Sequence, residues 1–148
     1  MDMKRLIILA FLFMAACTPK RDVIPTYWGL TPTQARLASE LHAKDVGGLF
    51  YHVAPTGSME PFLTGGDYIV VQKIPYKDVK PGMAANYQAR WLPPSSPTVT
   101  HWVADRLGDE FIMDGQANSI YENKKNMLMG EKEFIGQVIA IYTTREKP

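Results

Sequence analysis

A serine-containing turn carries the clearest chemical signal in this chain. Ser58 follows Gly57 within the segment Pro55-Thr56-Gly57-Ser58-Met59-Glu60-Pro61. Glycine allows close approach and unusual backbone dihedrals, and Pro61 fixes the chain direction after the serine. A serine hydroxyl becomes a useful nucleophile only when a neighbour takes its proton and donors hold the oxyanion. The segment therefore predicts either a nucleophile with a base beside it or an ordinary surface turn between two strands.

The segment Thr100-His101-Trp102-Val103 offers a base for that serine. Alternate side chains of a strand share a face, so His101 is expected to point with Val99 and Val103 toward the apolar interior. A buried imidazole needs a hydrogen-bond partner, and imidazole is well suited to accept a proton near neutral pH. His101 is thus either a core histidine bonded to a backbone carbonyl or the base for Ser58. The second interpretation predicts a serine endopeptidase.

Five short motifs, taken in their order and spacing, resemble the signal peptidase I family over about residues 50 to 142. In chain order they are Gly57-Ser58-Met59-Glu60-Pro61, Gly66-Asp67, Thr100-His101-Trp102-Val103, Gly115-Gln116-Ala117-Asn118 and Gly136-Gln137-Val138-Ile139. The resemblance implies a coiled antiparallel β barrel with an exposed groove. It also implies an endopeptidase that cleaves extended segments of exported proteins after small residues.

Within that family, this chain looks like the branch in which a histidine replaces the bacterial lysine. The resemblance then implies Ser58 as the nucleophile and His101 as the base. Thr56 matches the family's oxyanion-hole hydroxyl, which would act together with the backbone N–H of Ser58. Lys73 and His52 are the alternative bases. Lys73 does not stand at the family's catalytic position, and His52 has no counterpart there, so His101 is favoured.

The sequence leaves the third member of the catalytic group open. The family usually has an aspartate that orients the histidine, and Gln116 stands at that place. A carboxylate would hold the imidazole tautomer and stabilise the imidazolium, whereas a glutamine could orient the ring without supplying charge. Glu122 and Asp114 are the nearby carboxylates that could serve instead.

The first 17 residues have the features of a lipoprotein-type signal peptide. Lys4 and Arg5 precede an apolar run over residues 6–16, which is shorter than the ~20 residues of a membrane-spanning helix and fits a secretory segment. Met14-Ala15-Ala16-Cys17 resembles a bacterial lipobox, which implies a lipidated Cys17 and a membrane anchor. We therefore expect a location in the cell envelope, anchored on the extracytoplasmic side. The alternative is an ordinary signal peptide with an incidental cysteine.

One helix is predicted before the β-rich part of the chain. Thr31 and Gln34 have the spacing of a capping box, and Gly47 can end the helix. Leu37 and Leu41 share one face of this helix. The sequence thus predicts a helix of about 12 to 15 residues.

A mainly β fold is predicted after this helix. Six runs rich in β-branched or aromatic residues predict strands, over residues 49–53, 68–74, 83–91, 99–107, 110–113 and 134–142. A stiff loop is expected at 93–97, a tight turn at 108–109 and a long polar excursion at 115–131. The predicted organisation is a signal peptide (1–17), a tether with the helix (18–47) and a β peptidase domain (48–148). The mainly β pattern favours a barrel or coiled sheet.

Composition narrows the expected partners. The chain has 16 basic and 15 acidic residues, so no overall field draws it to nucleic acid. The sequence has no phosphate-binding glycine loop or metal-ligand cluster, so no metal or other cofactor is expected. The expected partners are an extended protein or peptide substrate and, through the lipid, a membrane. The competing interpretations are a catalytically degenerate envelope lipoprotein that uses the barrel as a binding module, and a self-cleaving regulator of the SOS-repressor type.

Overall fold

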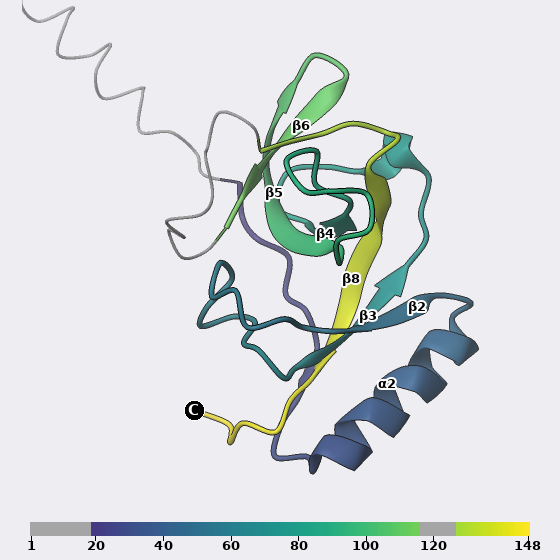
Figure 1. Ribbon diagram of the computed structural model, residues 1–148, viewed down its shortest axis with the longest axis vertical. Helices are drawn as coiled ribbons and strands as arrows, with labels where there is room; N and C mark the ends of the chain where they lie inside the picture. Colours follow the sequence, from purple (N-terminus) through teal and green to yellow (C-terminus); the bar gives the residue numbers. More distant parts are fainter. Residues whose placement is uncertain (1–18, 116–126) are drawn as a thin grey trace, which may run out of the picture.

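The computed structural model describes residues 19–115 and 127–148, which form a mainly antiparallel sheet with one α-helix packed beside it (Figure 1). The elements in chain order are β1 (Thr26–Tyr27), α2 (Pro32–Asp45), β2 (Leu49–His52), β3 (Tyr68–Gln72), the short 3-10 helix η1 (Tyr76–Asp78), β4 (Ala84–Tyr87), β5 (Val99–Leu107), β6 (Glu110–Asp114), β7 (Leu128–Met129) and β8 (Phe134–Tyr142). The predicted signal peptide with Cys17 lies outside the described residues, as do Gln116 and Glu122.

Strand β8 pairs with three other strands of the sheet. The strand order is β2-β3-β8-β4-β5-β6-β7, and β8 pairs with β3 and β4 in antiparallel fashion and with β1 in parallel. Register irregularities in β3, β4 and β5 interrupt the ladders, and such irregularities bend strands. The mainly β prediction is confirmed. The sheet is open among the described residues, with β2 and β7 at its two ends.

All six predicted strands form, although three are shorter than predicted, and β2 ends at His52. Strand β4 ends at Tyr87, because the Gln88 N–H leaves the ladder and donates to the Glu133 carbonyl at 2.9 Å. Strand β3 ends at Gln72. The short strands β1 and β7 were not predicted, and they lie in the expected tether and the expected polar excursion. Strands of two residues are too short to leave a periodic pattern in the sequence.

Helix α2 begins and ends where the sequence predicts. The Thr31 hydroxyl accepts from the Gln34 N–H at 3.2 Å, and the Gln34 side chain accepts from the Thr31 N–H at 2.9 Å. Gly47 follows the end of the helix with a φ of 63°, in the left-handed region that favours glycine. These local signals were readable because capping involves residues close together in the chain.

The helix packs through small residues rather than through its leucines. Leu37 and Leu41 are 45% and 61% exposed, whereas Ala35, Ser39 and Ala43 are buried. Small side chains allow the helix to approach the sheet closely, and Ala35 and Ala43 form a cluster with buried residues of β3 and β8. The shared face of Leu37 and Leu41 is therefore not the face that docks. In Figure 1 the helix lies beside β2 and β3, away from the β5–β6 hairpin.

Two separate apolar clusters anchor strand β5. Val103 packs with Tyr87 and Phe111 in one cluster, while Trp102 packs with Ile69 in the other. Alternate residues of a strand point to opposite faces, so β5 is held from both sides. Burying a large apolar side chain contributes about 1.5–3 kcal/mol. The strand that carries His101 is therefore among the best-anchored parts of the sheet.

Candidate active site

The structure brings Ser58 and His101 together. Ser58 Oγ lies 3.2 Å from His101 Nε2, close enough for a proton to pass from the hydroxyl to the imidazole. Ser58 is 6% exposed and His101 is fully buried. Burial keeps bulk water away from the pair and strengthens the interaction between the two groups.

Ser58 sits in a loop between β2 and β3, called here the serine turn (residues 54–67). Gly57 has a φ of 74°, a conformation that side chains disfavour. The Glu60 N–H donates to the Gly57 carbonyl at 3.2 Å, and the Leu63 N–H donates to the Met59 carbonyl at 2.9 Å. Met59 and Leu63 are buried in the apolar core. Ser58 is thus presented between a glycine that permits the bend and two apolar anchors that fix it.

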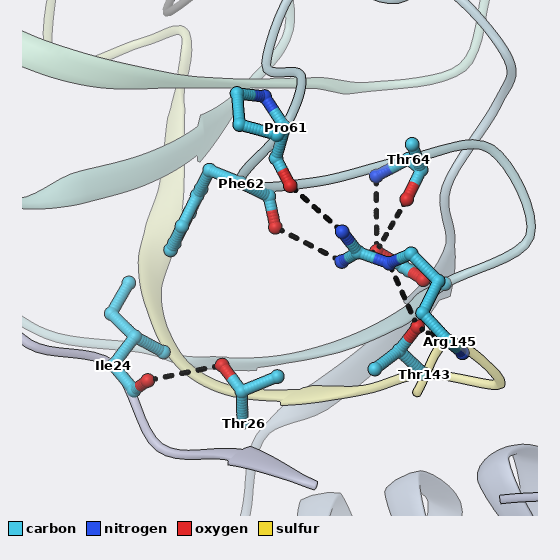
Figure 2. Close-up of polar contacts among 8 residues, drawn as sticks. Ile24, Thr26, Pro61, Phe62, Thr64, Thr143 and Arg145 are labelled. Carbon is cyan, nitrogen blue, oxygen red and sulfur yellow. Dashed lines mark hydrogen bonds and ion pairs between the residues drawn. The ribbon is translucent and has the colours of Figure 1, made fainter. Parts of the chain in front are cut away.

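Arg145 binds the part of the serine turn that follows Ser58 in the chain (Figure 2). Its guanidinium donates to the carbonyls of Pro61 at 2.7 Å and Phe62 at 3.2 Å. It also pairs with the carboxylate of Asp67 at 2.7 Å, and this carboxylate is almost completely buried. The Thr64 N–H donates to the same Asp67 oxygen at 3.0 Å. One side chain from the C-terminal segment therefore ties together the middle and the end of the turn.

His101 is positioned by its strand and by Tyr87. Ala85 of β4 stands opposite His101 in the ladder. The Tyr87 hydroxyl, on the same strand, lies 2.8 Å from His101 Nδ1. For Nε2 to accept the Ser58 proton, the hydrogen of the neutral ring must be on Nδ1, from which it can donate to the Tyr87 oxygen. Tyr87 can therefore hold the imidazole in the tautomer that a base needs.

Sequence reasoning missed Tyr87. Its only local signal is a place in a predicted strand, where an aromatic residue is expected for packing alone. Its role depends on the register that sets Ala85 opposite His101 and Tyr87 opposite Val99. Register is decided by long-range pairing, so no short motif could have identified this contact.

The three candidates for an orienting group are placed differently. Asp114 is the last residue of β6 and stands opposite Trp102. Its side chain is about half exposed, and its carboxylate lies 4.0 Å from the Arg21 guanidinium. Gln116 and Glu122 lie outside the described residues. The described group at His101 Nδ1 is the Tyr87 hydroxyl rather than the Asp114 carboxylate.

Thr56 lies beside the serine, as an oxyanion donor would. Its hydroxyl oxygen is 3.5 Å from Ser58 Oγ, at the long limit of a hydrogen bond. Thr56 is exposed, so its hydroxyl can turn toward a group that arrives at Ser58. A donor at this place would contact an oxygen bonded to the carbon that Ser58 attacks.

Lys73 and His52 were the two alternatives to His101 as the base for Ser58. Lys73 is exposed and lies just beyond the end of β3. His52 is exposed at the end of β2, and its ring stacks on Tyr68 with ring centroids 4.6 Å apart. The side chain that the structure places against Ser58 Oγ is that of His101.

A largely apolar cavity of about 590 Å³ opens beside Ser58. It runs between the end of β2 with the start of the serine turn and the segment that leads into β5, and Met59, Leu63 and Ile69 also line it. Among the described residues, none that lines the cavity is an aspartate, glutamate, lysine or arginine. Tyr51 lines it too, and burial raises the pKa of this phenol, which keeps it neutral at physiological pH. The cavity suits an uncharged segment of chain.

The described part of the chain was also searched for metal-binding groups and for membrane-spanning helices. Within residues 19–115 and 127–148, no group of three histidine, cysteine, aspartate or glutamate side chains is placed to hold a metal ion. In the same residues, no helix is both long enough and apolar enough to cross a membrane.

Comparison of the sequence with protein-family models gave no match, and comparison with curated proteins gave none either. The geometry around Ser58 is therefore the main guide to function.

Proposed function

We propose that this protein is a serine endopeptidase that uses a Ser58–His101 pair and is similar to signal peptidase I. The observation that carries the proposal is the 3.2 Å approach of Ser58 Oγ to His101 Nε2 at the wall of an apolar cavity. A buried histidine could equally bond a backbone carbonyl, but here its two ring nitrogens face two hydroxyls. That arrangement supports a proton acceptor with a fixed tautomer.

The proposed reaction begins with proton transfer from Ser58 to His101. As Nε2 takes the proton, Ser58 Oγ bonds to the carbonyl carbon of the scissile peptide, and Thr56 donates to the resulting oxyanion. The C–N bond then breaks, the leaving amine takes the proton from Nε2, and an acyl ester remains on Ser58. A water molecule attacks the ester with His101 again accepting a proton. The acid product leaves, and the proton returns to Ser58 Oγ.

The substrate in this proposal is an extended protein segment. The end of β2 and the start of β5 both line the cavity, and β2 is an edge strand to which a peptide in β conformation could add. The described residues that line the cavity include no carboxylate, lysine or arginine, which favours uncharged residues near the cleaved bond. The bent, mainly antiparallel sheet is compatible with the coiled β barrel of the signal peptidase family, and that finer fold assignment belongs to the same proposal.

An activity-based probe tests the nucleophile directly. A fluorophosphonate should label the wild type, and labelling should be lost in Ser58→Ala and fall at least a hundredfold in His101→Ala. Ser96→Ala is the matched control, because Ser96 lines the same cavity but is not placed against an imidazole. Labelling should also fall on acidification, since imidazolium cannot accept a proton. If the wild type is no more reactive than Ser58→Ala, the peptidase proposal fails and the binding-module interpretation replaces it.

The proposal also places the protein in the cell envelope through a lipid on Cys17. The support is the sequence of residues 1–17 alone. Metabolic labelling with a fatty acid should modify the wild type and not Cys17→Ala. Equal labelling of the two proteins, or none in either, would remove the lipid anchor without affecting the peptidase proposal.

A further inference from the structure

The first described residues are bound to the sheet. The Asp22 N–H donates to the Gly82 carbonyl at 2.8 Å, and the Gly82 N–H donates to a carbonyl of β5, also at 2.8 Å. The Lys20 carbonyl lies so close to Gly82 that a Cβ on this glycine would collide with it. Residues 20–22 are therefore fixed against the turn at residues 80–83, and we call these two segments together the anchor corner.

Further contacts hold the chain between the anchor corner and β1. The Arg21 guanidinium lies 5.1 Å from the centroid of the Trp102 ring, and Ile24 packs against the apolar cluster that contains Trp102. Strand β1 then pairs with β8. The sequence predicted a tether from residue 18 onward, but from Lys20 onward this segment is part of the folded domain.

Only two residues separate the anchor corner from the proposed lipid on Cys17. Thr18 and Pro19 lie between Cys17 and Lys20 in the chain. An extended chain spans at most about 3.3–3.6 Å per residue, so the Cα atoms of Cys17 and Lys20 are at most about 11 Å apart whatever path the chain takes. A linker that was free as far as Thr31 would allow roughly 50 Å. The docking of residues 20–22 therefore removes most of the distance by which the domain could stand off from a bilayer.

We infer that the anchor corner is the face of the protein that lies against the membrane, with phospholipid headgroups as its partner. This inference rests on the lipid on Cys17, which is part of the proposed function. The exposed Lys20 and Lys80 are each two residues from an aspartate, and Arg21 lies 4.0 Å from the Asp114 carboxylate. Because these opposite charges largely cancel, the short chain and not attraction to anionic lipid sets the contact.

Quenching by a spin-labelled lipid tests this orientation. Cys17 is the only cysteine of the chain, so once it carries lipid, a fluorophore attaches only to a second, introduced cysteine. Lys80→Cys places the fluorophore on the anchor corner. Lys44→Cys is the matched control, because Lys44 is also exposed and lies in the last turn of α2, and in Figure 1 this helix lies away from the start of the described chain.

The two lipidated, labelled proteins are incorporated into phosphatidylcholine vesicles that contain phosphatidylcholine with a nitroxide on its headgroup. A nitroxide quenches only at short range, so quenching at residue 80 should exceed quenching at residue 44 about threefold or more. The difference should persist at about 0.5 M salt, where exposed charges are screened.

Lengthening the connection should release the anchor corner from the bilayer. A flexible linker of about twelve Gly and Ser residues between Thr18 and Pro19 adds up to ~40 Å of chain and leaves the contacts of the anchor corner intact. Quenching at residue 80 should then fall about twofold or more. The same linker between Gly108 and Asp109, in the exposed turn that joins β5 to β6, should leave quenching unchanged.

The outcomes separate this inference from the peptidase proposal. If fatty acid labels Cys17 but residue 80 is quenched no more than residue 44, or if the linker after Thr18 has no effect, the anchor corner does not face the membrane and the peptidase proposal is unaffected. If Cys17 carries no fatty acid, the lipid anchor and this inference both fail. The expected quenching, combined with a wild type that does not react with the fluorophosphonate, removes the peptidase proposal and supports the orientation.

Discussion

The serine turn and the strand that carries His101 meet at one hydrogen bond but are held by different forces. Residues 54–67 contain no strand, and their far side is tied by the Arg145 guanidinium to two carbonyls and a buried carboxylate. His101 instead lies on β5, paired with β4 and followed by residues paired with β6. Apolar clusters cover both faces of that strand.

Because of this difference, we expect the position of the serine turn to change more easily than the position of strand β5. Polar contacts of a turn are few and directional, so losing one can shift the serine while the sheet remains folded. A strand packed on both faces moves only if the core is disrupted. We therefore expect substitutions near Ser58 to affect geometry through single contacts, and those near His101 to act through the orientation of a ring whose backbone stays in place.

Arg145→Ala should have the largest effect. It leaves the buried Asp67 carboxylate without its guanidinium partner, and breaking such a pair is strongly destabilising. Because Arg145 is partly exposed and Asp67 keeps its bond from the Thr64 N–H, we expect a loss of about 2–3 kcal/mol in the free energy of unfolding. Chemical denaturation measures this loss, and fluorophosphonate labelling at Ser58 should slow in parallel.

Arg36→Ala is the matched control for that substitution. Arg36 forms an exposed helical ion pair with Glu40 at 3.2 Å, which is worth only about 0.3–0.5 kcal/mol. If the two substitutions lowered the free energy of unfolding equally, the serine turn would not depend on the polar contacts of Arg145.

Tyr87→Phe should come next and should affect rate more than stability. It removes the hydroxyl at His101 Nδ1 but keeps the ring in the core. We expect labelling of Ser58 to slow about thirtyfold, equivalent to ~2 kcal/mol in the barrier, with a shifted pH profile of labelling. Tyr51→Phe, which removes a phenol from the cavity wall, should leave the profile unchanged. An unchanged profile in Tyr87→Phe as well would exclude tautomer control by Tyr87.

Thr56→Val should have a smaller effect, confined to catalysis. The hydroxyl is exposed and 3.5 Å from Ser58 Oγ, so water competes with it and its loss should slow peptide cleavage about tenfold. The melting temperature should not change, because the side chain is not in the core. Thr56→Ser keeps the hydroxyl and should restore most of the rate. Failure of serine to do so would indicate that the threonine acts by shape and not as a donor.

The smallest effect is expected at Glu133, which belongs to neither region. A hydrogen bond from Arg90 holds the pKa of this carboxyl below its usual range, so the folded state favours the carboxylate. Its stabilisation is complete above the ordinary pKa of a glutamate and disappears as pH falls through the lower pKa of the folded state. Glu133→Gln should therefore destabilise by about 0.5 kcal/mol at pH 7, and the difference should vanish at an acidic pH at which the carboxylate of the folded protein is protonated. Denaturation at the two pH values measures it, and a difference that persisted in acid would refute the assigned cause.

The predicted fold was most accurate where the deciding interactions are local. The capping box at Thr31 and Gln34 and the end of the helix at Gly47 all appear. The sequence placed Leu37 and Leu41 on one face of the helix but did not indicate which face docks, and it is the small residues Ala35 and Ala43 that pack against β3 and β8. The strands β1 and β7 escaped prediction because only their partners β8 and β6 define them.

The sequence by itself determined the chemical types at the candidate site. A serine behind a flexible glycine, a nearby hydroxyl and a histidine on an apolar strand are all visible in the chain, because turns and strand alternation are short-range properties. Only the tertiary structure decided that Ser58 Oγ meets His101 Nε2, that Tyr87 faces Nδ1, and that Arg145 secures the serine turn. Those contacts join residues distant in the chain, and strand register together with packing sets them, so no local pattern specifies which partners meet.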